Sequence, residues 1–349
     1  MIAEVSFFVE KNINGDPISY ANIKEITVMK NRRKGMMKMQ RINDYFKQSS
    51  LWMKRNARPL DNARWEYFFE GKSKENVIQY LSAFQNEDGG FGHGIEPDFW
   101  NPYSSPMATW AAAQILYEIG ANKDEPIVQS MIAYLIKTSD AETGMWESVR
   151  PENNDYPHAP WWSWKEGVQK NWMFNPGAEL AAYLVHWAKD DEAEQIGWTS
   201  IEKAINHLMN KNEMDMHEVG NFQQLVQIMK QYEDPFNEKI PFTLEEVTKK
   251  VLDLVENSFE KEPSRWKTGY KALPVDFIDH PSHPLYEKYE SLVEENLKFF
   301  IEELSEEGAW DISWDWGTYP KDFPVARRYW QGSITVNRYK LFKAFGYLE

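Results

Sequence analysis

The chain contains no cysteine. This absence excludes disulfide bonds, thiolate nucleophiles and every metal site that needs a cysteine ligand. No stretch approaches the roughly 18–20 consecutive apolar residues that span a bilayer. The N-terminus also lacks the basic start and apolar run of a signal peptide. We therefore expect a protein of the cytoplasm without a transmembrane segment.

Positive charge is also scarce. The 349 residues carry 39 Lys and Arg against 54 Asp and Glu, which gives a formal net charge of −15. Such a surface repels phosphate backbones, and the one short basic cluster is Arg32-Arg33-Lys34. Nucleic acid is therefore not expected among the partners.

Aromatic residues, in contrast, are abundant. They make up 15% of the chain and include 16 tryptophans. Tryptophan is large and amphipathic, so this count suits either a thick core or a cavity that binds flat, ring-shaped ligands.

The chain divides into two unequal parts. Residues 1–36 contain short β-like pieces at 5–9 and 23–28 and show no helical period. We interpret 1–36 as an N-terminal extension, with a small hairpin as the ordinary alternative, and 37–349 as one domain. The Arg-Lys-Gly run before a group of methionines also supports the hypothesis that natural translation starts at Met36, Met37 or Met39.

From about residue 39 onward, apolar residues recur at spacings of three and four, which indicates helices. The clearest segments are 58–70, 74–85, 106–119, 126–138, 176–189, 199–211, 219–232, 243–259, 284–304 and 333–346. Pro126 stands at a helix start, Thr243 opens a capping box, and Gly120 stands where a C-terminal cap is expected. No alternating strand pattern appears, so we predict an all-α fold.

A repeated motif refines this prediction. It occurs at Tyr80–Phe91, Tyr134–Trp146 and Phe300–Trp310, each with an aromatic-aliphatic pair, then Gln or Ser, then glycine, then an aromatic residue. The pair packs the last turns of a helix, Gln or Ser caps exposed backbone groups, and glycine permits the positive φ of a sharp turn. The final aromatic folds back over the helix end. Such ends, each followed by another helix, predict helical hairpins arranged around an axis.

These segments resemble the QW motifs of the terpenoid cyclase and prenyltransferase superfamily, over roughly residues 58–346. The first copy keeps Gln85, and the other two keep Gly-x-Trp. The resemblance implies an α/α toroid of about five to six helical hairpins with a central cavity for an apolar or isoprenoid-like ligand.

The chemical signatures of that superfamily are not reproduced. The Asp-x-Asp-Asp motif of class II cyclases is absent, and the zinc site of protein prenyltransferases needs a cysteine that this chain lacks. The nearest match to the magnesium motif of class I synthases is 190–194, which instead has the form of a solvated helix end.

Three inserts follow the three repeats, and we name them loop A (92–106), loop B (147–175) and loop C (311–331). Each carries acids or histidine beside tryptophan and precedes a helix that should line the interior. We therefore expect the three loops to converge on a pocket.

Close carboxylate pairs in these loops are the first catalytic candidates. A pair desolvated by tryptophan has one member with a raised pKa, which can act as a general acid. The catalytic candidates are Asp315, Asp311, Glu96, Asp98 and His93. The structural alternative for Asp311 and Asp315 is capping of the next helix or pairing with Arg327 and Arg328.

The ligand-binding candidates share an aromatic or polar side chain in the same loops. They are Trp100, Asn101, His158, Trp161, Trp162, Trp314, Arg327, Trp330 and Gln331. Aromatic walls stabilise carbocations and also stack on sugar faces, so both uses stay open. Core packing is the alternative for any single tryptophan, as is a hydrogen-bonded structural role for a single histidine.

One polar segment has metal-binding chemistry. Asp276, Asp279, His280 and His283 carry donors that suit a divalent cation, although two prolines also favour a polar turn. We assign no metal ligand and no cofactor, and a divalent metal stays an open alternative.

Three functions are compatible with these residues. The first is a prenyltransferase- or cyclase-like protein that uses acid catalysis from Asp315 or loop A. The second is a glycan hydrolase or lyase with two carboxylates across a tryptophan-lined cleft. The third is a non-catalytic domain that binds a small molecule, a glycan or a protein. The sequence determines neither the substrate nor the oligomeric state.

Overall fold

The computed structural model describes residues 42–140 and 142–348. Within these ranges the chain forms helices and loops, with isolated β-bridges and no strand. A helical stretch at 42–56 is followed by α2 (Pro59–Phe69), α3 (Lys74–Leu81), α4 (Pro106–Glu118), α5 (Pro126–Thr138), α6 (Gln169–Trp172), α7 (Gly177–Trp187), α8 (Asp191–Met209), α9 (Met216–Met229), α10 (Glu233–Lys239), α11 (Leu244–Ser258), α12 (Pro274–Phe277), α13 (Tyr286–Glu303) and α14 (Phe323–Ala344). The all-α prediction is confirmed.

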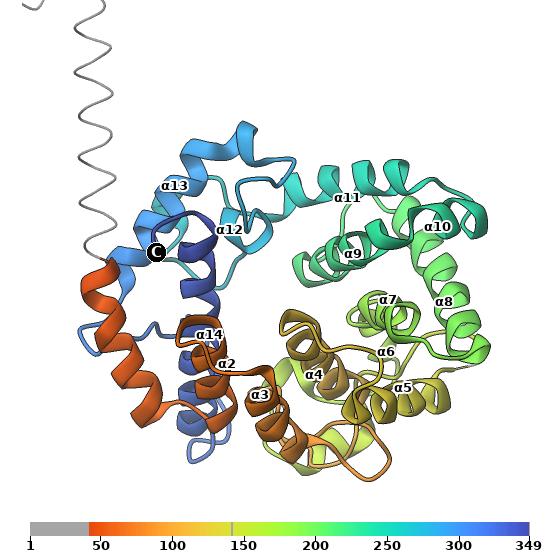
Figure 1. Ribbon diagram of the computed structural model, residues 1–349, viewed down its shortest axis with the longest axis horizontal. Coiled ribbons are helices and arrows are strands. Elements are labelled where there is room, and N and C mark those ends of the chain that lie inside the picture. The colour runs from red at the N-terminus through yellow and green to blue at the C-terminus, as the bar shows by residue number, and fades with distance from the viewer. Residues whose placement is uncertain (1–41, 141, 349) are drawn as a thin grey trace, which may run out of the picture.

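Figure 1 shows the helices following one another around a common centre. α2, α4, α7, α9 and α14 lie nearer the centre, while α5, α8, α11 and α13 lie farther out. The last helix packs against the first ones: the rings of Trp65 in α2 and Tyr339 in α14 meet edge to face, with centroids 5.0 Å apart. Gly332 allows this approach, because a Cβ there would lie 3.1 Å from Cβ of Ala57. The more specific expectation, a closed toroid of five to six hairpins, stays a prediction.

Most helix bounds agree with the apolar periodicity, and α5 covers the predicted 126–138. Two predicted starts are wrong. α8 begins at Asp191 rather than 199, and α14 begins at Phe323 rather than 333. The first turn of α8 is acidic, and Asp190 caps it by accepting from the Ala193 amide at 2.9 Å. This acidic turn carries little periodic signal, whereas at the start of α14 Pro324 and the Arg327-Arg328 pair interrupt the apolar spacing.

The repeated helix ends are built as the motif predicts. Gly89, Gly144 and Gly308 have φ values of 90°, 65° and 94°. The indole N–H of Trp146 donates to the Leu135 carbonyl at 2.9 Å, and that of Trp310 donates to the Phe300 carbonyl at 2.7 Å. The folded-back tryptophans therefore donate to carbonyls of the last helical turns, and the Leu135 carbonyl also accepts from the Ser139 amide.

The first copy of the motif ends in Phe91, whose side chain has no N–H to donate. Gln85 supplies the missing donor, because its Nε2 donates to the Gly89 and Ile127 carbonyls at 3.0 Å each. Phe91 itself is fully buried. In this copy Gln85 therefore joins the turn after the helix to the start of α5.

Residues 1–41 lie outside the described ranges. The N-terminal extension at 1–36, the candidate start methionines and the basic cluster at 32–34 therefore stay predictions. In the described ranges, no helix combines the length and the apolar character that crossing a bilayer requires.

Candidate functional site

Loops A, B and C meet, as the sequence predicts. Loop A pairs with loop B through a β-bridge between Phe99 and His158, and the Ala159 amide donates to the Asp98 carbonyl at 2.9 Å. Loop A joins loop C through the side chain of Asp98, which receives the indole N–H groups of Trp314 and Trp316. Asp98 therefore lies where all three loops come together.

Asp98 is a buried acid held by aromatic donors. It is 2% exposed, and its two carboxylate oxygens accept from Trp316 Nε1 at 2.7 Å and Trp314 Nε1 at 3.0 Å. Burial raises the pKa of Asp98 to about 6, although the indoles of Trp316, Trp330 and Trp314 oppose the rise. Nε1 of Trp330 is buried and reaches no hydrogen-bond geometry within the described chain. Neutral donors stabilise the carboxylate less than a cation does, so the acid retains a proton into the mildly acidic range.

Glu96 lies two residues before Asp98 and is also buried, at 7% exposure. Burial, and then the nearby charge of Asp98, raise the pKa of Glu96 well above its ordinary value, while Arg58 opposes the rise. Its Oε2 atom has no hydrogen-bond partner among the described residues. Of the two predicted carboxylate pairs, Glu96 and Asp98 form the one whose members are both buried.

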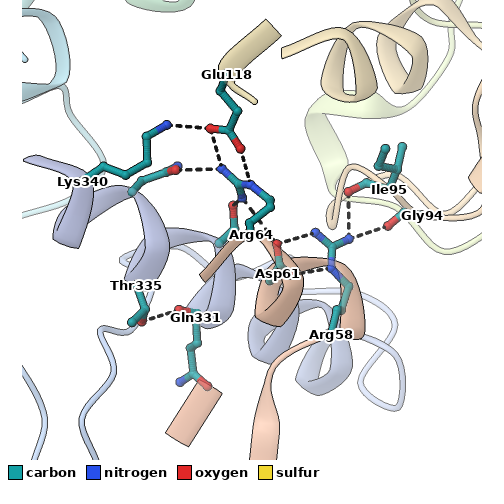
Figure 2. Close-up of polar contacts among 11 residues, drawn as sticks. Arg58, Asp61, Arg64, Gly94, Ile95, Glu118, Gln331, Thr335 and Lys340 are labelled. Atoms are coloured by element: carbon teal, nitrogen blue, oxygen red, sulfur yellow. Dashed lines mark hydrogen bonds and ion pairs between the residues drawn. The ribbon is translucent and has the colours of Figure 1, made fainter. Parts of the chain in front are cut away.

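A charged cluster contacts the backbone at the start of loop A (Figure 2). Arg58, the residue before α2, pairs with Asp61 at 2.7 Å. It also donates to the carbonyls of Gly94 at 3.1 Å and Ile95 at 2.8 Å. One guanidinium thus joins the start of α2 to the backbone immediately before Glu96.

The cluster continues across three helices that Figure 2 shows side by side. Arg64 of α2 donates to Glu118 of α4 at 3.1 Å, and Lys340 of α14 donates to the same carboxylate at 2.6 Å. Burial would raise the pKa of Glu118, but the charges and hydrogen bonds of Arg64 and Lys340 outweigh it and lower the pKa. A buried charge with two cationic partners is strongly held, and removing one partner would leave the other charges uncompensated.

A pocket of about 380 Å³ opens between loops B and C. Its lining consists of Asn154, His158, Pro160, Ser163, Thr318 and Tyr319. Tyr319 has a φ of 51°, a left-handed conformation that non-glycine residues rarely adopt. The ring of Tyr319 lies 5.6 Å from that of His158 and 6.2 Å from that of Trp316, which binds Asp98. Trp316 therefore contacts both Tyr319, which lines the pocket, and Asp98, which does not.

His158 is the predicted site residue that lines this pocket directly. Its Nδ1 lies 2.6 Å from the Tyr156 carbonyl oxygen, and its Nε2 lies 3.0 Å from Oγ of Ser163. A carbonyl oxygen only accepts, so Nδ1 carries a proton and the neutral ring accepts at Nε2. His158 is 6% exposed, so it lies in the pocket wall.

Other predicted ligand-binding residues lie near the junction in supporting positions. Trp100 stacks on Tyr329 at 6.2 Å, and Asn101 donates to Asn153 at 3.3 Å. Trp162 is 6% exposed, whereas Trp161 is 39% exposed. Trp161 is thus the one of these tryptophans whose ring is open to solvent.

The predicted desolvated pair of Asp311 and Asp315 is wrong. Asp315 is exposed and accepts from the Gly317 amide at 2.6 Å. Asp311 is exposed and pairs with Arg327. Hydrogen bonding to Arg327 lowers the pKa of Asp311, opposite to what a proton donor needs. The ion pair with Arg327 is the structural alternative that the sequence left open.

The remaining candidates were predicted in loops C and A. Arg327, Trp330 and Gln331 belong to α14 rather than to a loop, because that helix starts earlier than predicted. Gln331 donates to Asp311 at 3.2 Å, beside Arg327. His93 is exposed and bonds Asn86 at 2.9 Å within its own turn, so it does not join the acids.

The segment with metal-binding chemistry forms local turns. Asp276 accepts from the Leu273 amide at 2.7 Å, His280 bonds Ser282 at 2.8 Å, and His283 accepts from the Leu285 amide at 3.2 Å. Across the described residues, no three His, Cys, Asp or Glu side chains come together as a metal-ion cluster. The donors of this segment therefore serve backbone turns.

Sequence reasoning missed a second buried acid, Glu179 on α7. It is 1% exposed and accepts from Trp110 at 2.7 Å, Tyr183 at 2.6 Å and Gln114 at 3.2 Å. Burial raises the pKa of Glu179 to about 7, and the hydrogen bonds from Tyr183, Trp110 and Gln114 oppose the rise. Its signal was present in the sequence as a lone acid within the apolar run 177–185.

Tyr270 was also missed. It is 52% exposed, its ring meets Trp314 at 5.3 Å, and its hydroxyl lies 3.2 Å from His217 Nε2. Surrounding protein raises the pKa of Tyr270, and the charges of Asp276, Asp215, Asp98 and Glu96 add to the rise. Tyr270 therefore joins Trp314, which binds Asp98, to His217 at the start of α9. The residues next to Tyr270 in the sequence carry no signal for these contacts.

Comparison with known proteins adds no assignment: no protein-family model matches the chain, and neither a curated protein nor a solved structure matches it.

Proposed function

We propose that this protein binds a carbohydrate in the pocket between loops B and C. The observation that carries the proposal is the lining, which combines an amide (Asn154), hydroxyls (Ser163, Thr318) and aromatic rings (His158, Tyr319). Sugars present hydroxyl groups around an apolar ring face, so they need polar partners together with an aromatic surface. The volume of about 380 Å³ suits a ligand of one or two sugar rings.

The way the pocket is held supports a binding role. Backbone bonds attach loop B to loop A, and Asp98 attaches loop A to loop C through Trp316. The walls come from loops B and C, and loop A joins these two loops through bonds that need no ligand. Such preorganisation lowers the entropy that binding must offset.

A second candidate, acid catalysis, is supported by Asp98 itself. A buried carboxyl with a pKa of about 6 retains a proton in mildly acidic solution, which is what a general acid requires. In this extension of the proposal, a ligand displaces the Trp314 or Trp316 indole from the carboxyl, because Asp98 does not line the pocket, and Asp98 then donates a proton, as in glycan cleavage or in cyclase-like chemistry on an isoprenoid. The polar lining of the described pocket favours the glycan over the isoprenoid.

Calorimetric titration with a panel of oligosaccharides tests the binding proposal. We expect saturable binding that Tyr319→Ala weakens at least tenfold and Thr318→Val weakens less. The matched control is Tyr80→Ala, because Tyr80 is an exposed aromatic on α3, outside the pocket. Binding that is equal in Tyr319→Ala and the wild type, or the absence of any saccharide ligand, would overturn the proposal.

A further inference from the structure

We infer that Ser163 and His158 form a nucleophile–base pair that cleaves carboxylic esters. Ser163 Oγ lies 3.0 Å from His158 Nε2, and both residues line the same pocket. This inference goes beyond carbohydrate binding and does not require it, because the chemistry belongs to the pair and to an acyl group.

His158 is in the tautomer that a general base needs. Nδ1–H donates to the Tyr156 carbonyl at 2.6 Å, which leaves Nε2 to accept the proton of the Ser163 hydroxyl. In familiar hydrolases a carboxylate orients the imidazole, and here a backbone carbonyl performs that orientation. The imidazole is also held by the β-bridge between Phe99 and His158.

Ser163 is held from both sides. The amide of the next residue, Trp164, donates to Asn154 Oδ1 at 2.8 Å, and Asn154 Nδ2 returns a bond to the Trp164 carbonyl at 3.0 Å. On the other side, Asn153 donates to the Trp162 carbonyl at 3.3 Å. Two neighbouring asparagines therefore fix the backbone around the hydroxyl, and fixed geometry is a main source of catalytic rate.

In this inference the opposite wall stabilises the developing negative charge. Thr318 and Tyr319 line the pocket, and their backbone N–H groups form no hydrogen bond with another described residue. Unengaged backbone N–H groups are the usual stabilisers of the oxyanion in acyl transfer. The left-handed φ of 51° at Tyr319 is the kind of backbone strain that clusters at functional sites.

The chemistry balances with water as the one co-reactant. Ser163 Oγ bonds to the ester carbonyl carbon while its proton moves to His158 Nε2. The bond from that carbon to the alcohol oxygen then breaks, and His158 gives the proton to the leaving alkoxide. Water then attacks the acyl carbon while His158 takes one of its protons. The bond from that carbon to Ser163 Oγ breaks, and His158 returns the proton to Oγ, so the products are an alcohol, a carboxylic acid and the restored hydroxyl.

A covalent probe tests the inference on the full chain. Diisopropyl fluorophosphate should add one phosphoryl group per chain, and peptide mass spectrometry should place it on Ser163. Ser163→Ala should remove the label and lower the rate of p-nitrophenyl acetate hydrolysis at least 100-fold, the lower range of general-base catalysis. The substitution removes one oxygen from a half-buried side chain, so thermal unfolding should stay near the wild-type temperature.

Ser282 provides the matched control. Its hydroxyl also bonds an imidazole, Nδ1 of His280 at 2.8 Å, but it is exposed and does not line the pocket. Ser282→Ala should therefore keep full labelling and full hydrolysis. An unlabelled wild type, a label that survives in Ser163→Ala, or a label on Ser282 would each overturn the inference. None of these results depends on whether a saccharide binds.

Discussion

The raised pKa of Asp98 makes stability depend on pH in a defined direction. The folded value is about 6 against an ordinary 3.8, so the folded chain holds this proton more tightly than the unfolded chain. The resulting stabilisation is fully present below about pH 3.8 and is lost as pH rises through 6. Because Asp98 is 2% exposed, solvent screening takes little from this effect.

The substitution Asp98→Asn removes the titration and keeps the shape. Linkage between the two pKa values predicts that wild type loses about 2 kcal/mol of unfolding free energy relative to the variant between pH 4.5 and 7.5. The variant also loses one acceptor, because an amide nitrogen then faces one of the two indole N–H donors. That loss is expected to lower stability by roughly 1–3 kcal/mol at every pH.

Urea unfolding followed by tryptophan fluorescence at several pH values measures both effects. Asp311→Asn is the control, because ion pairing lowers the pKa of Asp311 and its contribution changes with pH in the opposite direction. Parallel stability curves for wild type and Asp98→Asn would refute the reasoning, since they would mean that Asp98 titrates alike in the folded and unfolded chains.

Two further predictions follow from other buried groups. Glu179→Gln should reduce the loss of unfolding free energy between pH 5 and 8 by roughly 2–3 kcal/mol, because the folded pKa of about 7 lies above the ordinary 4.5. Urea unfolding at these pH values measures the profile, and a variant that kept the wild-type slope would contradict the prediction. Trp310→Phe should destabilise the chain by about 1 kcal/mol through the Phe300 carbonyl that loses its donor, plus the lost packing. Trp161 is exposed, so Trp161→Phe should leave the melting temperature within about a degree or two. Equal effects of the two changes in calorimetry would count against the capping role of Trp310.

Local chemistry explains which parts of the fold were predictable. The bounds of α5, the capping box at Thr243 and the positive φ of Gly89, Gly144 and Gly308 depend on a few neighbouring residues, so the sequence carries their signals. The start of α14 was missed because Pro324 and the Arg327-Arg328 pair interrupt the apolar spacing there, although Ala326 in the first turn is fully buried.

The candidate site was predictable in location and not in detail. Loops A, B and C converge as expected, because each follows the same kind of helix end. Asp98 and Asp311 look equivalent in sequence, each an acid near tryptophan. Only one of them is buried, since Asp311 meets Arg327 at the surface.

By itself, the sequence determined the helical class, the repeated helix ends and the three loops worth attention, because these follow from residues within a turn or two of each other. Only the tertiary structure decided which acids hold protons and which serine meets a histidine. Burial raises the pKa of Asp98, and Trp316, which contacts the carboxylate, lies 218 residues away along the chain. The pocket beside Ser163 needs Thr318 and Tyr319 for its far wall. Burial and pairing are properties of the packed chain, so no local pattern could carry them.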